Sequence, residues 1–450
     1  MASERPITVF QVIVGKAGTI TVAREPRSED IPICKVIIDK LQQRTTQVLV
    51  GMLREGRLKS EEEFKVLGAN LYRVLFANEI GKAVTDALYQ PLKLVRVELE
   101  FDEEQEILSS WPWEYLYCPE EYGQAGSGYF LAGQKRLVLT RRIRLNVSRR
   151  QPIDKPPLKV LLVASGPTGH PIEYDKVREA IESPGTEMIK VTALLPSGEP
   201  GKALKATWSN FTDMLDAEDF HAIHFLGHGK WDSDKKVGTI LFMRKDNTAD
   251  PRSQDEIATT LMGMSSLHLV FLQACESAES DPYQAFSGVA QQLAQKAIPA
   301  VVGMQTKINH EVANRFASAF YVALANKLTV DAALQTARRT ILDESSDSAQ
   351  KLGFGLPVLY LRESESLFAA AGPTSTAQTI SDLVTCVWCG ERNKPTDNFC
   401  ARCIGALFCL NCKASVDRTR PTCGSCGKPL GQPSKDYSAA KAAAAGDGFA

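Results

Sequence analysis

The sequence has almost no net charge and no long apolar run, and both absences limit what the protein can be. Its 52 Lys and Arg nearly balance its 53 Asp and Glu, leaving a net charge of −1, so overall charge predicts no polyanionic partner. No run of roughly 18 apolar residues is present, which argues against a membrane-spanning helix. The first ten residues lack the basic-then-apolar pattern of a secretory leader. We therefore expect a cytoplasmic protein without membrane contact.

Cysteine is scarce outside one segment of the chain. Eight of the 11 cysteines fall between Cys386 and Cys426, and the others are Cys34, Cys118 and Cys275. In a cytosolic protein, cysteines in closely spaced pairs favour metal binding over disulfide bonds. The clustered cysteines therefore predict a metal site near the C-terminus.

These clustered cysteines form four C-x-x-C pairs, and two such pairs supply the four thiolates that a tetrahedral zinc ion needs. A site closed by four thiolates has no open position, so we expect two structural Zn²⁺ ions and no catalytic metal. The predicted ligands are Cys386, Cys389, Cys400 and Cys403 for the first ion, and Cys409, Cys412, Cys423 and Cys426 for the second.

Most of the remaining chain alternates between short apolar runs and segments of helical spacing. Within the run Lys159–Ser165, residues 160–164 are continuously apolar, as expected of a strand covered on both faces. Such alternation predicts an α/β fold with a mainly parallel sheet flanked by helices. Strands are expected near 5–15, 93–101, 136–145, 159–165, 188–193, 221–225, 239–243, 268–273, 300–304 and 357–361, and helices near 30–55, 60–88, 173–182, 202–216, 254–263, 284–296, 310–327 and 330–343.

Two segments of the N-terminal part have distinctive composition. Trp111-Pro-Trp-Glu-Tyr-Leu-Tyr117 is aromatic and short, and we interpret it as a packing anchor. The run Arg136–Leu145 carries Arg141, Arg142 and Arg144. Because charged residues often protect the edges of sheets from pairing, we expect a solvated edge strand there.

Two apolar runs end abruptly at side chains that can carry chemistry. His221-Ala-Ile-His-Phe-Leu-Gly-His-Gly229 ends at His228, and Leu269-Val-Phe-Leu-Gln-Ala-Cys-Glu-Ser-Ala278 reaches Cys275. Functional groups of α/β sheets collect at the carboxyl ends of strands. A single Cys or His in such a place is more often structural. Together they match thiol catalysis, in which an imidazole keeps the thiolate ionised and carries protons.

Several motifs in a fixed order extend this pattern beyond the two strand ends. Gln273-Ala274-Cys275 follows His228 by 47 residues (275 − 228), close to the spacing of about 50 in caspases. The chain thus resembles CHAT-domain proteins, a branch of the caspase-like cysteine peptidases related to separases, over roughly residues 60–362. The resemblance rests on the segments beginning at Trp111, Leu158, His224, Leu272, Ala297, Phe316 and Ala332.

The resemblance implies roles for individual residues. Cys275 would be the nucleophile, His228 the general acid and base, and the backbone N–H groups of Gly229 and Cys275 the oxyanion hole. His221 and His224 are interpreted as structural. No cofactor is expected for the reaction itself. The C-terminal segment resembles a double zinc ribbon, and we expect it to replace the tetratricopeptide repeats that often accompany this family and that we do not find here.

The predicted organisation follows from these motifs. We expect an N-terminal α/β region over 1–155, a caspase-like catalytic domain over 156–362, a linker over 363–385, the double zinc ribbon over 386–430 and a disordered tail over 431–450. The predicted function is cleavage of a protein partner by a caspase-like cysteine endopeptidase, targeted or regulated through the zinc ribbons by a further protein. The alternative is a catalytically silent scaffold whose zinc ribbons bind protein or nucleic acid, although nucleic acid is the less expected partner.

Overall fold

A computed structural model of the chain divides it into two compact units, residues 1–370 and 371–450. The finer boundaries predicted from the sequence stay predictions. The structure describes residues 7–25, 36–77, 79–90, 94–123, 127–145, 150–198, 203–232, 237–274, 282–296, 298–305, 309–345, 347–362 and 366–369, and in the second unit 384–386, 392–393, 407, 422–423 and 426–428.

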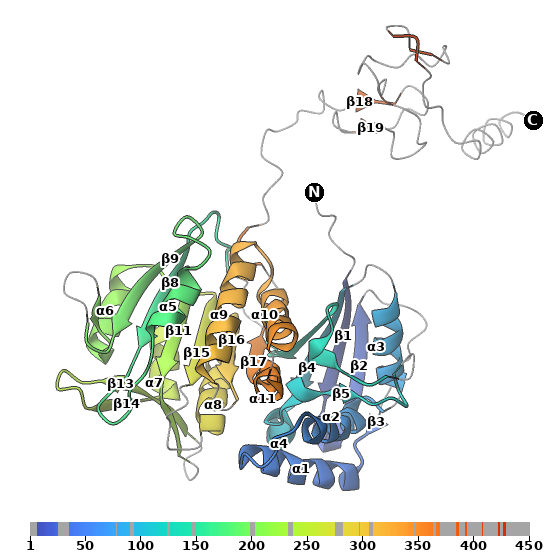
Figure 1. The fold of residues 1–450 in the computed structure, drawn as a ribbon, viewed down its shortest axis with the longest axis horizontal. Helices are drawn as coiled ribbons and strands as arrows, with labels where there is room; N and C mark the ends of the chain where they lie inside the picture. The colour runs from blue at the N-terminus through green and yellow to red at the C-terminus, as the bar shows by residue number, and fades with distance from the viewer. Residues whose placement is uncertain are drawn as a thin grey trace, which may run out of the picture. The chain divides into compact units, whose positions relative to one another are not determined.

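One sheet of twelve strands organises the first unit (Figure 1). Eight of its eleven neighbouring pairs are parallel, which confirms the predicted α/β fold with a mainly parallel sheet. In spatial order the strands are β10 (Leu204–Lys205), β9 (Ile189–Leu195), β8 (Leu158–Ala164), β11 (Ala222–Gly227), β15 (Leu269–Ala274), β16 (Ala300–Met304), β17 (Pro357–Leu361), β7 (Leu137–Arg142), β4 (Leu94–Phe101), β1 (Ile7–Val14), β2 (Thr19–Glu25) and β3 (Val36–Ile37).

Helices flank this sheet, and three small sheets complete the described chain. The helices are α1 (Lys40–Arg54), α2 (Glu61–Leu75), α3 (Glu79–Tyr89), α4 (Glu106–Ser109), α5 (Asp175–Glu182), α6 (Trp208–Ala217), α7 (Gln254–Met262), α8 (Pro282–Gln295), α9 (His310–Ala325), α10 (Val330–Glu344) and α11 (Ser348–Lys351). The small sheets pair β12 (Gly229–Asp232), β13 (Val237–Met243) and β14 (Ala249–Ser253), β5 (Tyr117–Cys118) with β6 (Tyr129–Phe130), and β18 (Val384–Thr385) with β19 (Arg392–Asn393).

Capping residues explain where several helices begin and end. Ser60 accepts from the backbone N–H of Glu63, whose carboxylate accepts in return from the backbone of Ser60, so a capping box starts α2. The predicted helix over 60–88 is two helices, since α2 ends at Leu75, is capped by Phe76, and α3 begins at Glu79. The predicted helix over 202–216 begins only at Trp208, after Thr207 caps it. The two residues of β10 before that cap pair with β9 instead.

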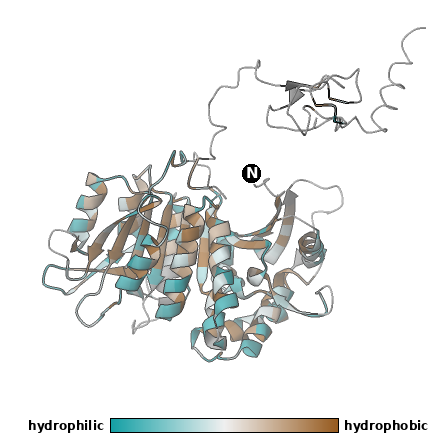
Figure 2. Ribbon diagram, turned by 45° about the horizontal axis from the view of Figure 1, so that its top comes forward, coloured by the Kyte–Doolittle hydropathy of each residue, from teal (hydrophilic) through white to brown (hydrophobic). Residues whose placement is uncertain are grey.

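The strands in the middle of the sheet are almost wholly buried. In β8 every residue except Lys159 is buried, because helices and further strands cover both faces. Figure 2 shows hydrophobic residues gathered along the strands of the sheet. The core is thus continuous across the sheet, from the strands before residue 155 to those after it.

The strand that carries the arginines is not at the edge of the sheet. β7 lies between β4 and β17 in parallel pairing, so the prediction of a solvated edge strand is wrong. Arg141 on this strand is 4% exposed and pairs with the buried Glu114. The sequence misled us because a buried ion pair leaves the same pattern of charges as a solvated edge. β17, the last strand of this sheet along the chain, likewise lies inside it, between β16 and β7.

Candidate active site

The strands that precede the predicted catalytic residues are direct neighbours. β11 and β15 pair in parallel, and in their register Gly227 lies opposite Ala274. His228 follows Gly227 in the sequence, and Cys275 follows Ala274. Cys275 lies outside the described residues, so its side chain and its amide carry no structural statement. The structure therefore brings the two strand ends together at one edge of the sheet.

The backbone of His228 is held in place by hydrogen bonds, and the residue is only 1% exposed. Its carbonyl oxygen accepts from the N–H of Leu241, 3.0 Å away. The carbonyl of Leu241 accepts in turn from the hydroxyl of Ser165 at 2.6 Å. Three segments, the ends of β8 and β11 and the strand β13, thus fix the backbone around this imidazole.

Glycine is required on the strand just before His228. A Cβ atom at Gly227 would lie 2.9 Å from the carbonyl oxygen of Ser165 and 2.9 Å from the ring of Phe225, closer than real Cβ atoms come. Gly229, on the other side, begins β12 and pairs with Ile240. Its predicted place in the oxyanion hole stays a prediction, since the second donor lies outside the described residues.

A second histidine, which the sequence analysis did not single out, lies beside His228. The imidazole ring of His170 has its centroid 5.0 Å from that of His228. It comes from the loop after β8, whose carboxyl end lies at the same edge as the end of β11. Its buried Nδ1 has no hydrogen-bond partner among the described residues. The run Ser165-Gly-Pro-Thr-Gly-His170, directly after an apolar strand, was the available signal.

His224, four residues before His228, lies in the core. Its Nδ1 is 3.0 Å from the hydroxyl of Tyr321, its Nε2 is 3.2 Å from Oε1 of Gln273, and its ring stacks on Phe271. Burial lowers its pKa to about 3. His224 is therefore neutral near pH 7 and cannot donate a proton to a leaving group. These contacts support the structural role predicted for it.

The remaining predicted features fall in different places. His221 accepts a hydrogen bond at Nδ1 from the backbone N–H of Lys159, 3.0 Å away, which also supports a structural role. The aromatic segment is a packing anchor as predicted, since Trp111, Trp113 and Tyr115 are all buried.

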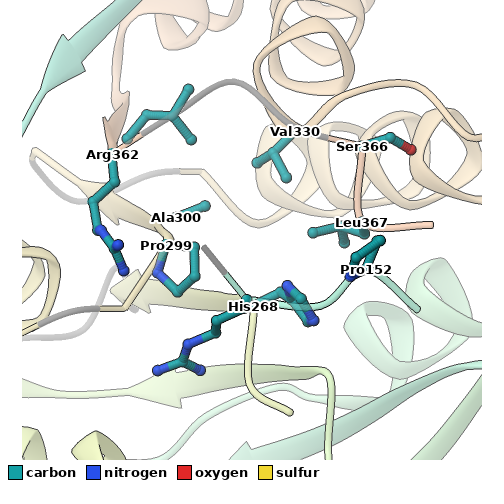
Figure 3. Close-up of a pocket in the computed structure, with 10 residues that line it drawn as sticks. Pro152, His268, Pro299, Ala300, Val330, Arg362, Ser366 and Leu367 are labelled. Carbon is teal, nitrogen blue, oxygen red and sulfur yellow. The ribbon is translucent and has the colours of Figure 1, made fainter. Parts of the chain in front are cut away.

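A cavity of about 30 Å³ lies at the opposite edge of the sheet (Figure 3). His268 and Ala300, at the starts of β15 and β16, line it together with Arg362. Burial is the largest of the effects that lower the pKa of His268 to about 4, and the positive charge of Arg150 acts in the same direction. Leu367, from the start of the predicted linker, also lines this cavity and packs into the core.

The second unit is described at only a few residues. Among the predicted zinc ligands these include Cys386, Cys423 and Cys426, while the other five ligands lie outside the described residues. The Cys423 carbonyl accepts from the N–H of Gly427, and the N–H of Cys423 donates to the carbonyl of Lys428, both at 2.8 Å. Gly427 has a φ of 68°, in the left-handed region that favours glycine. Within the described residues no three potential ligands come together as a metal site.

Comparison with known proteins gives a family and a set of distant structures. Residues 65–390 match the CHAT domain. The separase of the Saccharomyces cerevisiae separase–securin complex is similar, with 12% identity and a TM-score of 0.44, over 81% of this chain and 30% of that chain. The Arg-specific cysteine proteinase gingipain R is similar with 10% identity and a TM-score of 0.37, over 82% of this chain and 79% of that one.

This chain therefore spans about 30% of the separase chain that it matches. The search of curated proteins gave no match. None of the helices among the described residues is long and apolar enough to cross a membrane.

Proposed function

Because this chain belongs to the CHAT-domain family, we propose that it is a caspase-like cysteine endopeptidase that cleaves a protein partner with Cys275 and His228. The observation that carries the proposal is the register of β11 and β15, in which Gly227 lies opposite Ala274. Adjacent parallel strands end about 4.8 Å apart. His228 and Cys275, which directly follow Gly227 and Ala274 in the sequence, therefore begin at neighbouring points on one edge of the sheet.

The chemistry needs only these two side chains and suitable donors. The Cys275 thiolate attacks the carbonyl carbon of the scissile peptide bond, and backbone N–H groups, with Gly229 proposed as one donor and Cys275 as the other, stabilise the oxyanion. The C–N bond then breaks while His228 gives its proton to the leaving amine. Water, deprotonated by His228, hydrolyses the thioester and releases the new carboxylate together with the thiolate.

The burial of His228 supports an activation step. At 1% exposure its imidazole is closed to a substrate, so the atoms around it must move before a peptide can bind. A protein partner that displaces them would couple recognition to cleavage. The backbone of His228 is fixed by Leu241 and Ser165, so we expect the movement in the covering atoms rather than in β11.

We propose further that residues 386–430 bind two structural zinc ions through the eight predicted thiolates, and that they recruit or regulate rather than catalyse. The tight turn at Cys423, with Gly427 in the left-handed conformation, fits the knuckle that a C-x-x-C pair forms around zinc. Zinc would hold the ribbons folded. All four positions of each ion would be occupied by thiolates, so no water could be activated there.

The competing proposal is a silent CHAT scaffold whose zinc ribbons bind protein or, less expectedly, nucleic acid. A scaffold requires neither a glycine-flanked His228 nor a Cys275 at the neighbouring strand end. The pairing of β11 with β15, which puts the residues before His228 and Cys275 opposite each other, therefore favours the peptidase.

A peptide-library cleavage screen of the full chain, alone and with candidate partner proteins, would separate the two proposals. Wild type should cleave a restricted set of peptides, and Cys275→Ala should cleave none while keeping the same unfolding midpoint. An electrophilic peptide probe should label wild type at Cys275. Identical cleavage by the Ala variant would show that Cys275 is not the nucleophile. Neither cleavage nor labelling under any condition, despite correct folding, would favour the scaffold instead.

A further inference from the structure

Gln305 stands at the end of β16, next to the strand that leads to Cys275. In the parallel pairing of β15 and β16, Leu272 lies opposite Gly303. Two residues further along each of these two segments are Ala274 and Gln305. Gln305 is 2% exposed, although an amide side chain is costly to bury unless it is hydrogen-bonded. Its partners therefore show what this position is built to do.

Those partners come from two distant parts of the chain. The side-chain Nε2 of Gln305 donates to Oε2 of Glu114 at 2.8 Å and to the carbonyl of Gly355 at 2.9 Å. Its backbone N–H donates to the carbonyl of Leu356 at 2.9 Å. One residue thus ties the end of β16 both to the turn before β17 and to the aromatic segment of the N-terminal part.

Glu114 is itself rigidly held. Arg141 donates to its two carboxylate oxygens, from Nε at 3.1 Å and from Nη2 at 2.7 Å, and Glu114 is only 1% exposed. Such bidentate pairs fix both partners in one geometry. The next residue, Tyr115, donates through its hydroxyl to the carbonyl of Leu352 at 2.7 Å. Gln305 therefore donates to a charged carboxylate, that of Glu114, which is held in a fixed position.

We propose that Glu114 and Gln305 are positioning residues for the peptidase: Glu114, oriented by Arg141, holds Gln305 and so fixes the end of β16 beside the strand that carries Cys275. This inference rests on the proposed function. It assigns to the N-terminal part a direct role in shaping the substrate side of the catalytic edge. The role is geometric, since neither side chain is assigned a contact with the reacting atoms.

A second buried ion pair also joins the N-terminal part to the rest of the chain. Glu114 and Gln305 are therefore not needed for that joining alone. Arg96 on β4 donates from Nε to Oδ2 of Asp331 at 2.6 Å, and Asp331 is fully buried in the first turn of α10. The neighbouring residue Val330 lines the cavity at the opposite edge of the sheet. This pair joins the same parts far from the catalytic edge and provides a matched control.

The test compares Gln305→Leu with Asp331→Asn in the full chain, using two thiol probes. Iodoacetamide labelling, read at Cys275 by peptide mass spectrometry, measures the reactivity of that thiol without a bound substrate. An acyloxymethyl ketone built on the best peptide from the library screen also requires a positioned substrate. Gln305→Leu should slow peptide-probe labelling about tenfold, equivalent to about 1.4 kcal/mol. It should leave iodoacetamide labelling within about twofold, because the thiolate and His228 are untouched.

The control variant should lose stability without losing reactivity toward either probe. Asp331→Asn should lower the unfolding midpoint at least as much as Gln305→Leu but leave both labelling rates within about twofold, because sites that share no partners act independently. Glu114→Gln keeps an oxygen that can accept from Gln305, so its peptide-probe rate should fall between wild type and Gln305→Leu.

The outcomes separate this inference from the proposed function. Wild type that reacts with neither probe at Cys275 would refute the peptidase and this role with it. Wild type that reacts, with Gln305→Leu and Glu114→Gln unchanged in the peptide-probe rate, would overturn the positioning role alone. Equal slowing of both probes by Gln305→Leu and by Asp331→Asn would also overturn it, since general destabilisation would then be the cause.

Discussion

The two halves of the twelve-stranded sheet place their polar side chains differently. In β4 and β7 charged residues stand within the strands, and Arg96 and Arg141 each form a buried ion pair with another part of the chain. In β11 and β15 the buried polar side chains are His224 and Gln273, which bond to each other. The residues proposed to react, His228 and Cys275, directly follow the ends of these two strands in the sequence.

This difference fits the proposed function, in which position along a strand separates structural from reactive polar groups. A charge inside a strand needs a partner at a fixed distance, so it serves to join elements. A side chain beyond the last paired residue leaves the sheet and can face a substrate. The same distinction separates His224, inside β11, from His228, just beyond its end.

The largest effect is expected for the two histidines of β11. His228→Ala should reduce peptide-probe labelling of Cys275 by about 10²–10⁴, the range that a positioned acid–base group contributes. His224→Gln should leave the labelling rate of the folded protein nearly unchanged, because a buried neutral ring with a pKa of about 3 takes no part in proton transfer. Equal losses in both variants would show that position on the strand does not distinguish them.

In the other half, the buried pair of Glu114 and Arg141 should determine stability. Replacing Arg141 by Met leaves the Glu114 carboxylate buried without its partner, so the free energy of unfolding should fall by about 3–5 kcal/mol. Urea unfolding followed by tryptophan fluorescence measures this loss. The double variant Glu114→Leu, Arg141→Met should recover part of it. Strictly additive single losses would argue that the two side chains do not interact.

The buried histidines should make stability depend on pH. The pKa of His224 falls from an ordinary 6.5 to about 3, so below pH 6.5 the unfolded chain takes up a proton that the folded chain does not. Its contribution is complete above pH 6.5 and is lost as the pH falls toward 3. At pH 5 the loss should be about 2 kcal/mol. His268, with a pKa of about 4, adds a loss of the same sign.

Comparing the unfolding free energy at pH 7 and pH 5 measures this dependence. The difference should shrink by about 2 kcal/mol in His224→Gln, which has no group that titrates in this range. An unchanged difference would mean that other groups produce the pH dependence.

The smallest effect on the catalytic edge is expected from removing zinc. Metal analysis should give about two zinc ions per chain, one for each set of four thiolates. Chelation should leave peptide-probe labelling within about twofold, because the ions have no open coordination position. Zinc near zero in intact, unchelated protein would refute the two sites, and loss of labelling on chelation would connect the ribbons to catalysis.

A truncated chain offers the matching control, and the structure places the cut. Leu367 and Phe368 are buried, and Ile153 pairs with Phe368. A cut after residue 364 would therefore expose core, whereas a cut after Ala370, at the end of the first compact unit, keeps it. The chain cut after Ala370 should still be labelled at Cys275 by the peptide probe and should no longer bind zinc.

The sequence alone determined most strands of the large sheet and the alternation of strands with helices. Continuous apolar runs predicted β8, β11, β15 and β16, because strands covered on both faces need no polar alternation. His228 and Cys275 stood out because each directly follows such a run. The family resemblance and the C-x-x-C spacing were equally visible, since motif and spacing are properties of the chain itself.

Tertiary structure decided which distant side chains meet. The sequence gives no sign that Arg141 reaches Glu114, or that Glu114 meets Gln305 across 191 positions of the chain. A buried charge pair depends on the fixed separation of two elements, which local pattern does not encode. For the same reason β7 was mistaken for an edge strand, and His170 was overlooked until the fold brought its ring to 5.0 Å from that of His228.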